Sequence, residues 1–342
     1  MTTSDSPRTI LATPGRIERA TQRASRAKAR EQRQTRARPE PTAETLAVYE
    51  TKIQQLTRLH CADYKRLDWH DIAGRGLVEP ALPANAKELV ARKALAAYRP
   101  GFFDSLLGMG ADRRRRLAER VLEAAKADAL IYAEAKRNAD RHNLDVTLAA
   151  SILALEPEAV EKALGAHLPM GELKPALEGL SLSFPGAGRL VIYLDALELD
   201  VLPDESCAML ENGKGGYVPT SASALQELHV SNICSAILRV GLETLTTLPI
   251  EAVEVVARCY LPSPRTGEFE QHPVIYVKLP YEAVQRMDIR RLEPTSAVTA
   301  LGGRIDWDST RGFAPIQIHD LKLVADKSRA ALSQSAMGSG GA

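Results

Sequence analysis

The chain has 342 residues, of which 45% are hydrophobic and 25% are charged, so it has room for two domains with ordinary hydrophobic cores. No stretch approaches the roughly 20 consecutive apolar residues that a membrane span needs, and the N-terminus lacks the apolar core of a secretory signal. These features argue against a membrane or secreted protein. The four cysteines lie far apart in the sequence, as is typical of thiols in a reducing compartment, and this predicts a cytoplasmic protein.

Residues 1–41 form a basic segment. Positions 7–38 hold ten Lys or Arg against two acids, Glu18 and Glu31. The segment has few large apolar residues to bury, so we expect a disordered or solvent-exposed helical arm that is dispensable for folding. Such an arm suits a polyanion or an acidic partner surface, and a solvated tail without a partner is the alternative. The candidate binding residues are Arg23, Arg26, Arg30 and Arg33.

Residues 42–168 are predicted to be helical. Leu46, Tyr49, Ile53 and Leu56 recur at helical spacing, and further helices are expected near 85–98, over 112–153 and after Pro157. We expect this region to bind a protein partner or to self-associate. Four positive charges at the start of the long helix oppose its dipole, which indicates either an anionic partner or screening by solvent. These candidate binding residues are Arg113, Arg114, Arg115 and Arg116.

Residues 169–320 change to a mixed pattern of strands and helices. A strand is expected at 189–199, a hairpin turn at Asn212-Gly213 within 205–219, and a helix over 222–247 that ends at Pro249. Two strands follow at 252–261 and 272–279, joined through Thr266-Gly267, and we expect this pair to pack against the helix. Short helices are expected at 281–287 and 294–300 and a further helix at 319–334, so that residues 321–342 are expected to be a C-terminal helix and flexible tail.

This order of elements predicts the α+β class, with an N-terminal helical region followed by a small, mainly antiparallel sheet packed on a long helix. The expected divisions are an arm at 1–41, a helical region at 42–168, an α+β domain at 169–320 and a tail at 321–342.

The strand ending at Lys278 invites comparison with metal-dependent nucleases, which place a carboxylate two residues before such a lysine. Here that position is Tyr276, and the nearby acids are Glu254 on the partner strand and Glu270 near the turn. A nuclease needs carboxylates to hold a divalent cation beside the lysine. Glu254, Glu270 and Lys278 are therefore the candidate catalytic residues, and a purely structural sheet is the favoured interpretation.

Other familiar sites are not predicted. Gly213, Lys214 and Gly215 lack the preceding glycine and the following Ser or Thr of a phosphate-binding loop. His229 and Cys234 are five residues apart, about 140° around a helix, so they do not share a ligand face. We expect no metal and no cofactor.

Several stretches of the sequence carry a resemblance to a known family. They are "SNICSAILRVGLETLTTLPIEAVEVVA", "TGEFEQHPVIYVKLPYEAVQRMDIRRLEPTSAV" and "STRGFAPI", with further matches at "LDWHDIA" and "AAYRPGFFDSLLG". Through them the chain resembles a family of uncharacterised bacterial proteins over about residues 45–320, and Ser296 departs from it where the family tends to have an acid. The resemblance implies an architecture and no known activity.

The sequence therefore favours a non-enzymatic cytoplasmic interaction or scaffold protein of bacterial type. One alternative is a nucleic-acid-acting or defence-type effector enzyme with an unrecognised site. The other is a sequence-independent nucleic-acid binder that uses the basic arm.

Overall fold

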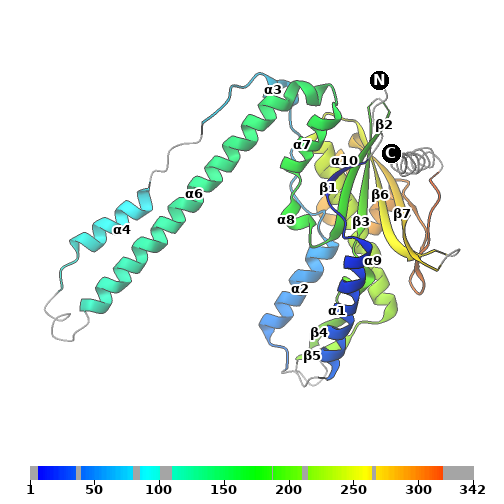
Figure 1. Ribbon diagram of the computed structural model, residues 1–342, viewed down its shortest axis with the longest axis horizontal. Coiled ribbons are helices and arrows are strands. Elements are labelled where there is room, and N and C mark those ends of the chain that lie inside the picture. The colour runs from blue at the N-terminus through cyan, green and yellow to red at the C-terminus, as the bar shows by residue number, and fades with distance from the viewer. Residues whose placement is uncertain are drawn as a thin grey trace, which may run out of the picture. The chain divides into compact units, whose positions relative to one another are not determined.

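The computed structural model describes residues 7–35, 40–79, 85–100, 110–186, 188–209, 215–263 and 267–318 (Figure 1). The predicted α+β class is confirmed, with helices preceding a mainly antiparallel sheet that packs on a long helix. The chain divides into two compact units, Met1–Leu67 with Ala154–Ala342 and Asp68–Leu153. The second unit is thus an insertion in the sequence of the first. No helix among the residues that are described is long and apolar enough to cross a membrane.

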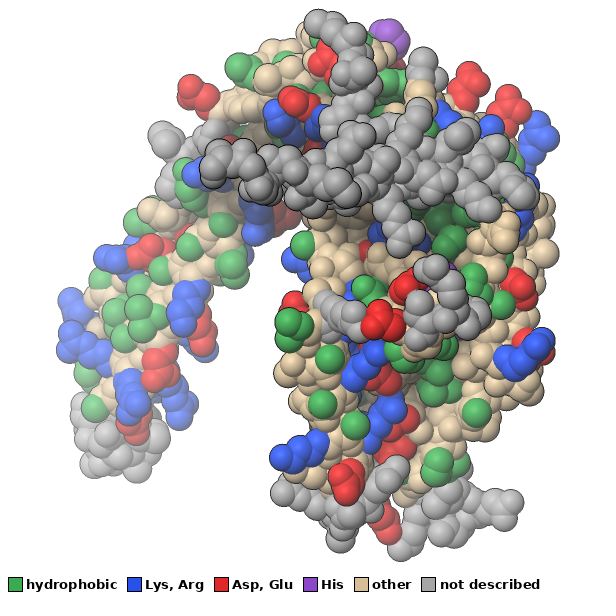
Figure 2. All heavy atoms as spheres, turned by 45° about the vertical axis from the view of Figure 1, so that its right-hand side comes forward, with side chains coloured by type: hydrophobic (Ala, Val, Ile, Leu, Met, Phe, Trp, Pro, Cys, Tyr) green, Lys and Arg blue, Asp and Glu red, His purple; other side chains and the backbone are tan. Residues whose placement is uncertain are grey.

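The smaller unit contains α3 (Trp69–Ala73), α4 (Ala86–Ala97) and α6 (Gly110–Leu153). α4 packs along α6, and both lie close to the ranges that their periodicity predicts. Few side chains are buried here, and in α4 none is. Figure 2 shows hydrophobic side chains lying among charged ones on the surface of this unit. The large apolar side chains that are 52–69% exposed on α4 and α6 are Leu89, Val90, Leu122, Leu130 and Ile131.

The larger unit is built around a six-stranded sheet with the order β1-β2-β3-β6-β7-β8. Neighbouring strands are antiparallel except β3 and β6, which run parallel. A parallel pair needs a crossover, and the long helix α9 (Ala222–Thr247) lies between these two strands in the chain. The strands are β1 (Arg8–Leu11), β2 (Leu177–Gly186), β3 (Arg189–Ala196), β6 (Ala252–Pro262), β7 (Phe269–Pro280) and β8 (Arg304–Ile305).

Smaller elements surround this sheet. The helices α2, α7 and α11 pack on α9, and β4 pairs with β5, as β9 does with β10, in two small antiparallel ladders. Their bounds are α1 (Arg16–Thr35), α2 (Ala43–Thr57), α7 (Pro157–His167), α8 (Met170–Leu173), η1 (Leu199–Val201), β4 (Glu205–Met209), β5 (Gly215–Pro219), α10 (Tyr281–Gln285), η2 (Ile289–Arg291), α11 (Pro294–Ala300), β9 (Trp307–Asp308) and β10 (Gly312–Phe313).

Helix α9 is the core helix of the larger unit. It begins after Ser221, whose hydroxyl accepts a hydrogen bond from the backbone N–H of Ala224 at 3.1 Å, and it ends just before Pro249. From Asn232 to Thr247 nearly every side chain is buried, including polar ones. The side-chain N–H of Asn232 donates to the carbonyl of Leu56 in α2 at 3.2 Å. As the sequence predicts, the strand pair β6–β7 packs against this helix.

Gly241 allows the close approach of α9 to the sheet. A Cβ at this position would overlap Cδ1 of Leu279 and lie 3.7 Å from Cγ2 of Val255, both fully buried. We expect Gly241→Ala to lower the free energy of unfolding by roughly 1–2 kcal/mol, because overpacking outweighs the better helix propensity of alanine.

The matched control is Gly165→Ala in α7, an exposed helical glycine with open space around its Cα. There the propensity gain acts alone and should raise stability by up to about 1 kcal/mol. Urea unfolding measures both variants, and a stabilised Gly241→Ala variant would show that the helix has room to shift.

The N-terminal segment differs from the predicted disordered or exposed arm. β1 forms an antiparallel edge strand on β2, with Arg8 opposite Leu182, and α1 follows it. Backbone pairing requires no apolar side chains, and Arg19 on α1 is only 3% exposed because carboxylates neutralise it. Residues Arg16–Thr35 thus form a helix, as one form of the prediction has it, but its basic side packs on carboxylates of the same unit. That the segment is dispensable for folding stays a prediction.

Several predicted features fall outside the residues that are described. These are the Asn212-Gly213 turn, Thr266, the helix at 319–334 and the tail to residue 342. The strands on either side of the two turns do pair as the sequence predicts, β4 with β5 and β6 with β7.

Candidate functional site

The antiparallel register of β6 and β7 brings two of the candidate catalytic residues together. Glu254 lies directly opposite Lys278. The Arg189 guanidinium on β3 donates to both oxygens of the Glu254 carboxylate, from Nε at 2.7 Å and from Nη2 at 2.8 Å. The Tyr276 hydroxyl donates to the same carboxylate at 3.1 Å. A bidentate arginine pair fixes the carboxylate in one orientation.

These contacts set the protonation of Glu254. Burial opposes its ionisation, but the hydrogen bonds from Arg189 and Tyr276 and the positive charge of Lys278 outweigh that effect, so the pKa of the carboxyl is lowered. Tyr276 responds in the opposite sense, because burial and the negative charge of Glu254 raise the pKa of its hydroxyl. At neutral pH the cluster therefore holds a carboxylate and a neutral phenol. A carboxylate held in this way is a weak proton acceptor and no proton donor.

The cluster lies in a pocket of about 660 Å³, which also includes Leu155 and Gly188. Both residues have left-handed backbones, with φ of 53° and 72°. Glycine adopts this conformation freely, whereas for leucine it is strained. Strained positions of this kind gather at functional sites more often than elsewhere, which makes the pocket a candidate site.

Glu270, the third candidate catalytic residue, does not join this pocket. It lies opposite Leu261 near the far end of the β6–β7 hairpin, where its side chain is exposed. No group of three or more His, Cys, Asp or Glu side chains in the described parts of the chain is placed to hold a metal ion.

The four consecutive arginines from Arg113 to Arg116 occupy the first turns of α6 and are exposed. Successive residues on a helix point about 100° apart, so the run surrounds the helix instead of forming one patch. The Arg115 Nε donates to Glu119, one turn further along, at 3.2 Å.

The arginines of the N-terminal segment form a ladder of ion pairs with carboxylates of the same unit. On α1 they recur at positions 19, 23, 26, 30 and 33, which places them on one side of the helix. The carboxylates come from β2 and from the segment after β3. The pairs are Arg19–Glu178 (2.6 Å), Arg23–Glu198 (2.6 Å), Arg26–Asp200 (2.7 Å), Arg30–Asp204 (3.1 Å) and Arg33–Asp204 (3.5 Å).

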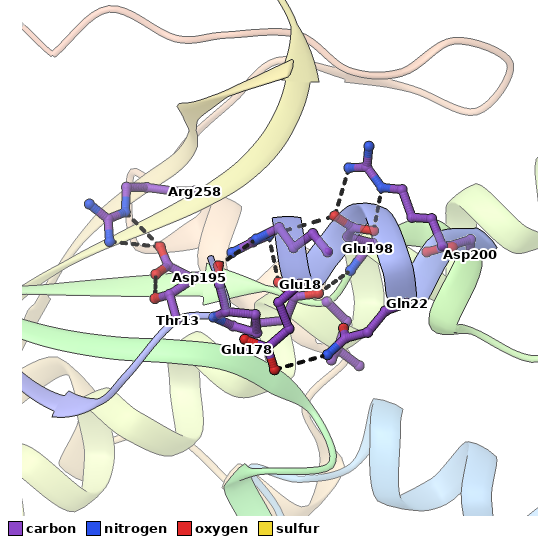
Figure 3. A network of polar contacts seen from close by, with 12 residues as sticks. Thr13, Glu18, Gln22, Glu178, Asp195, Glu198, Asp200 and Arg258 are labelled. Carbon is purple, nitrogen blue, oxygen red and sulfur yellow. Dashed lines mark hydrogen bonds and ion pairs between the residues drawn. The ribbon is translucent and has the colours of Figure 1, made fainter. Parts of the chain in front are cut away.

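Figure 3 shows Glu178, Glu198 and Asp200 beside helix α1, with dashed contacts running from the helix to the carboxylates. The pKa values of the two glutamates are shifted in opposite directions. Burial raises the pKa of Glu178 despite the charge of Arg19. Burial also opposes the ionisation of Glu198, but its hydrogen bonds from Arg23 outweigh this and lower its pKa. The lowered pKa belongs to the glutamate that receives a guanidinium in a bidentate manner.

Two aromatic rings also contact arginines of α1. The Arg19 guanidinium lies 3.9 Å from the ring centre of Tyr260, and that of Arg23 lies 4.5 Å from the ring centre of Phe269. A guanidinium over an aromatic face adds cation–π attraction to the ion pair. The candidate binding residues Arg23, Arg26, Arg30 and Arg33 are thus engaged within the larger unit.

A second polar contact lies at the start of this segment, also visible in Figure 3. The Thr13 hydroxyl donates to Asp195, and the Arg258 Nε donates to the other oxygen of that carboxylate at 2.7 Å. A Cβ on Gly179 would collide with both Thr13 and Asp195, so only glycine leaves room for this contact.

The acids of the ladder were not predicted from the sequence, because they are spread over residues 178–204. The 4-3-4-3 spacing of the arginines was the available signal, since it indicates a helix with one basic side. Comparisons with protein-family models, with curated proteins and with solved structures find no match for this chain.

Proposed function

We propose that this chain is a non-enzymatic interaction protein whose smaller, helical unit docks on a protein partner. The observation that supports this most is the exposure of large apolar side chains on a helical hairpin that buries little of its own surface. Leu122 and Leu130 of α6 are 64% and 69% exposed. A partner that covers such side chains removes their apolar surface from water, which favours binding.

The position of these leucines indicates which side of α6 is available. Val121, Ala124 and the buried Asp128 lie on the side that faces α4. Leu122 and Leu130 are eight residues apart, about 80° around the helix, and both lie on the other side. Exposed charges of both signs lie on that same side, among them Lys126, Arg137 and Glu119. An amphipathic helix with charges of both signs beside its apolar residues fits this surface.

The proposal is tested with a photo-crosslinking amino acid placed at Leu122 or Leu130 of the full chain in the cells that make it. We expect discrete higher-mass adducts, whose identification by mass spectrometry names the partner or shows a second copy. The control position is Val218, an apolar strand residue of the larger unit that is 39% exposed. Equal labelling at all three positions, or no adduct at the two leucines, would contradict the proposal.

A nucleic-acid-acting or defence-type effector enzyme is the second candidate function. It is favoured by the pocket that Glu254, Lys278 and Tyr276 share. Glu254 is committed to Arg189, which is typical of a structural ion pair, and this places the enzyme hypothesis second. Binding of nucleic acid through α1 is the third candidate, and it requires the arginine ladder to break.

A further inference from the structure

The parallel pair β3–β6 gives the sheet an end at which both strands finish. Because the two strands run in the same direction, the residues after Ala196 and those near Pro262 lie at one end of the sheet. Helix α9 connects the strands in the manner of a βαβ unit. In open sheets with parallel strands, ligands bind in the crevice beyond the carboxyl ends of these strands.

A cavity of about 430 Å³ lies at the carboxyl end of these two strands. Its volume falls in the range of about 300–1,000 Å³ that is usual for small-molecule sites. Residues from five parts of the larger unit surround it: α1, the η1 segment, α9, the β6–β7 hairpin and β10. The lining residues that matter below are Arg23, Ala27, Leu199, His229, Phe269, Arg311 and Phe313.

The walls of the cavity are apolar and aromatic. Phe313 meets the His229 ring edge to face, with ring centres 5.4 Å apart. His229 donates from Nε2 to the carbonyl of Leu197 at 2.8 Å, which fixes the ring. Burial lowers the pKa of His229 to about 4, so the imidazole is uncharged at neutral pH. Phe269 and Leu199 provide further apolar surface for the hydrophobic body of a ligand.

The charges around the cavity favour an acidic group. Its two carboxylates, Glu198 and Asp200, are already paired with Arg23 and Arg26. Arg311 is different, because its side chain is 86% exposed and its Nε lies 3.8 Å from Asp308. The Asp308 carboxylate instead accepts hydrogen bonds from the backbone N–H groups of Thr310 and Arg311. The Arg311 guanidinium is thus available to an incoming anion.

We propose that this cavity binds a small molecule with an aromatic or branched apolar body and one acidic group. The body fills the space between Phe313, Phe269 and Leu199, and the acid pairs with Arg311. This site is separate from the helical surface of the proposed function, so either can hold without the other.

The test uses the full chain and the fluorescent probe 8-anilinonaphthalene-1-sulfonate, which has an aromatic body and one acidic group. Arg311→Glu should weaken its binding about tenfold, the loss that one charge-assisted contact explains. The matched control is Arg291→Glu, because Arg291 is equally exposed and also pairs with an aspartate three residues before it. This control should bind the probe as the unaltered protein does.

Two tryptophan substitutions on α1 locate the probe. Ala27→Trp places a large ring at the mouth of the cavity and should abolish binding of the sulfonate probe. Ala24 is exposed on the same helix outside the cavity lining, so Ala24→Trp should leave binding of the sulfonate probe unchanged. Equal binding by both tryptophan variants would overturn the site.

The uncharged relative N-phenyl-1-naphthylamine tests the acid. It should bind more weakly than the sulfonate, and Arg311→Glu should not change its affinity. Equal affinity for both probes would overturn the acidic part of the proposal. Competition by phenylbutyrate or by phenyl phosphate then distinguishes a carboxylate ligand from a phosphate ligand.

Discussion

Replacing Val277 with Asp is expected to lower the free energy of unfolding by roughly 3–5 kcal/mol. Val277 is fully buried in β7 and lies opposite the equally buried Val255. Arg189 and Lys278, the cations beside Glu254, lie on the opposite side of the strand pair and do not reach the new carboxylate. The buried group would have to take up a proton or open the sheet.

Chemical denaturation followed by circular dichroism measures this loss. Val218→Asp is the matched control, because it makes the same change on an exposed strand valine of β5. It should change stability by less than about 1 kcal/mol. Similar losses in the two variants would mean that the apolar face of the β6–β7 pair is not the stability centre of the unit.

Replacing Arg19 with Ala is expected to cost roughly 3 kcal/mol, because it leaves Glu178 and Glu198 buried with less positive charge nearby. The double variant Arg19→Met with Glu178→Met should recover most of this loss, since an apolar pair of similar volume has no charge to desolvate. Arg33→Ala, at the exposed end of the same ladder, is the control and should change stability by less than about 1 kcal/mol.

The pH dependence of the Arg19→Ala variant provides a second measurement. Burial already raises the pKa of Glu178 in the folded protein, and Arg19 opposes that shift. Removing Arg19 raises this pKa further, so the folded state binds the proton more tightly than the unfolded chain. Stability then increases as the pH falls through the folded pKa. The loss should therefore be smaller at about pH 4.5 than at about pH 7, and a loss independent of pH would contradict this account.

The parts of the fold that the sequence predicts well depend on local signals. Apolar residues at helical spacing and Pro249 identify α9, and alternation identifies β6 and β7. β2 is not predicted, because "LEGLSLSFPG" contains two glycines and a proline that weaken any strand pattern. β1 is four residues long and exists through its pairing with a strand far along the chain, which no local pattern reveals.

The candidate sites follow the same rule. The hairpin register places Lys278 opposite Glu254, and that proximity is implicit in the sequence. Arg189 comes from a strand 65 residues away, so its bidentate contact with Glu254 depends on the parallel pairing of β3 with β6. The cavity at the carboxyl ends of β3 and β6 is likewise unpredicted, because residues of α1, α9 and β10 line it together.

The pairing of β1 with β2 has a consequence for how the protein is made. Arg8 is synthesised well before its strand partner Leu182, which follows only after the whole inserted unit Asp68–Leu153. At the usual rate of about 5–20 residues per second, the wait is roughly 10–35 s. Glu178, Glu198 and Asp200 arrive in the same late interval, so the basic helix remains without its acids until the growing chain reaches them. β1 therefore joins the sheet only after β2 has been made, although β1 comes long before β2 in the chain.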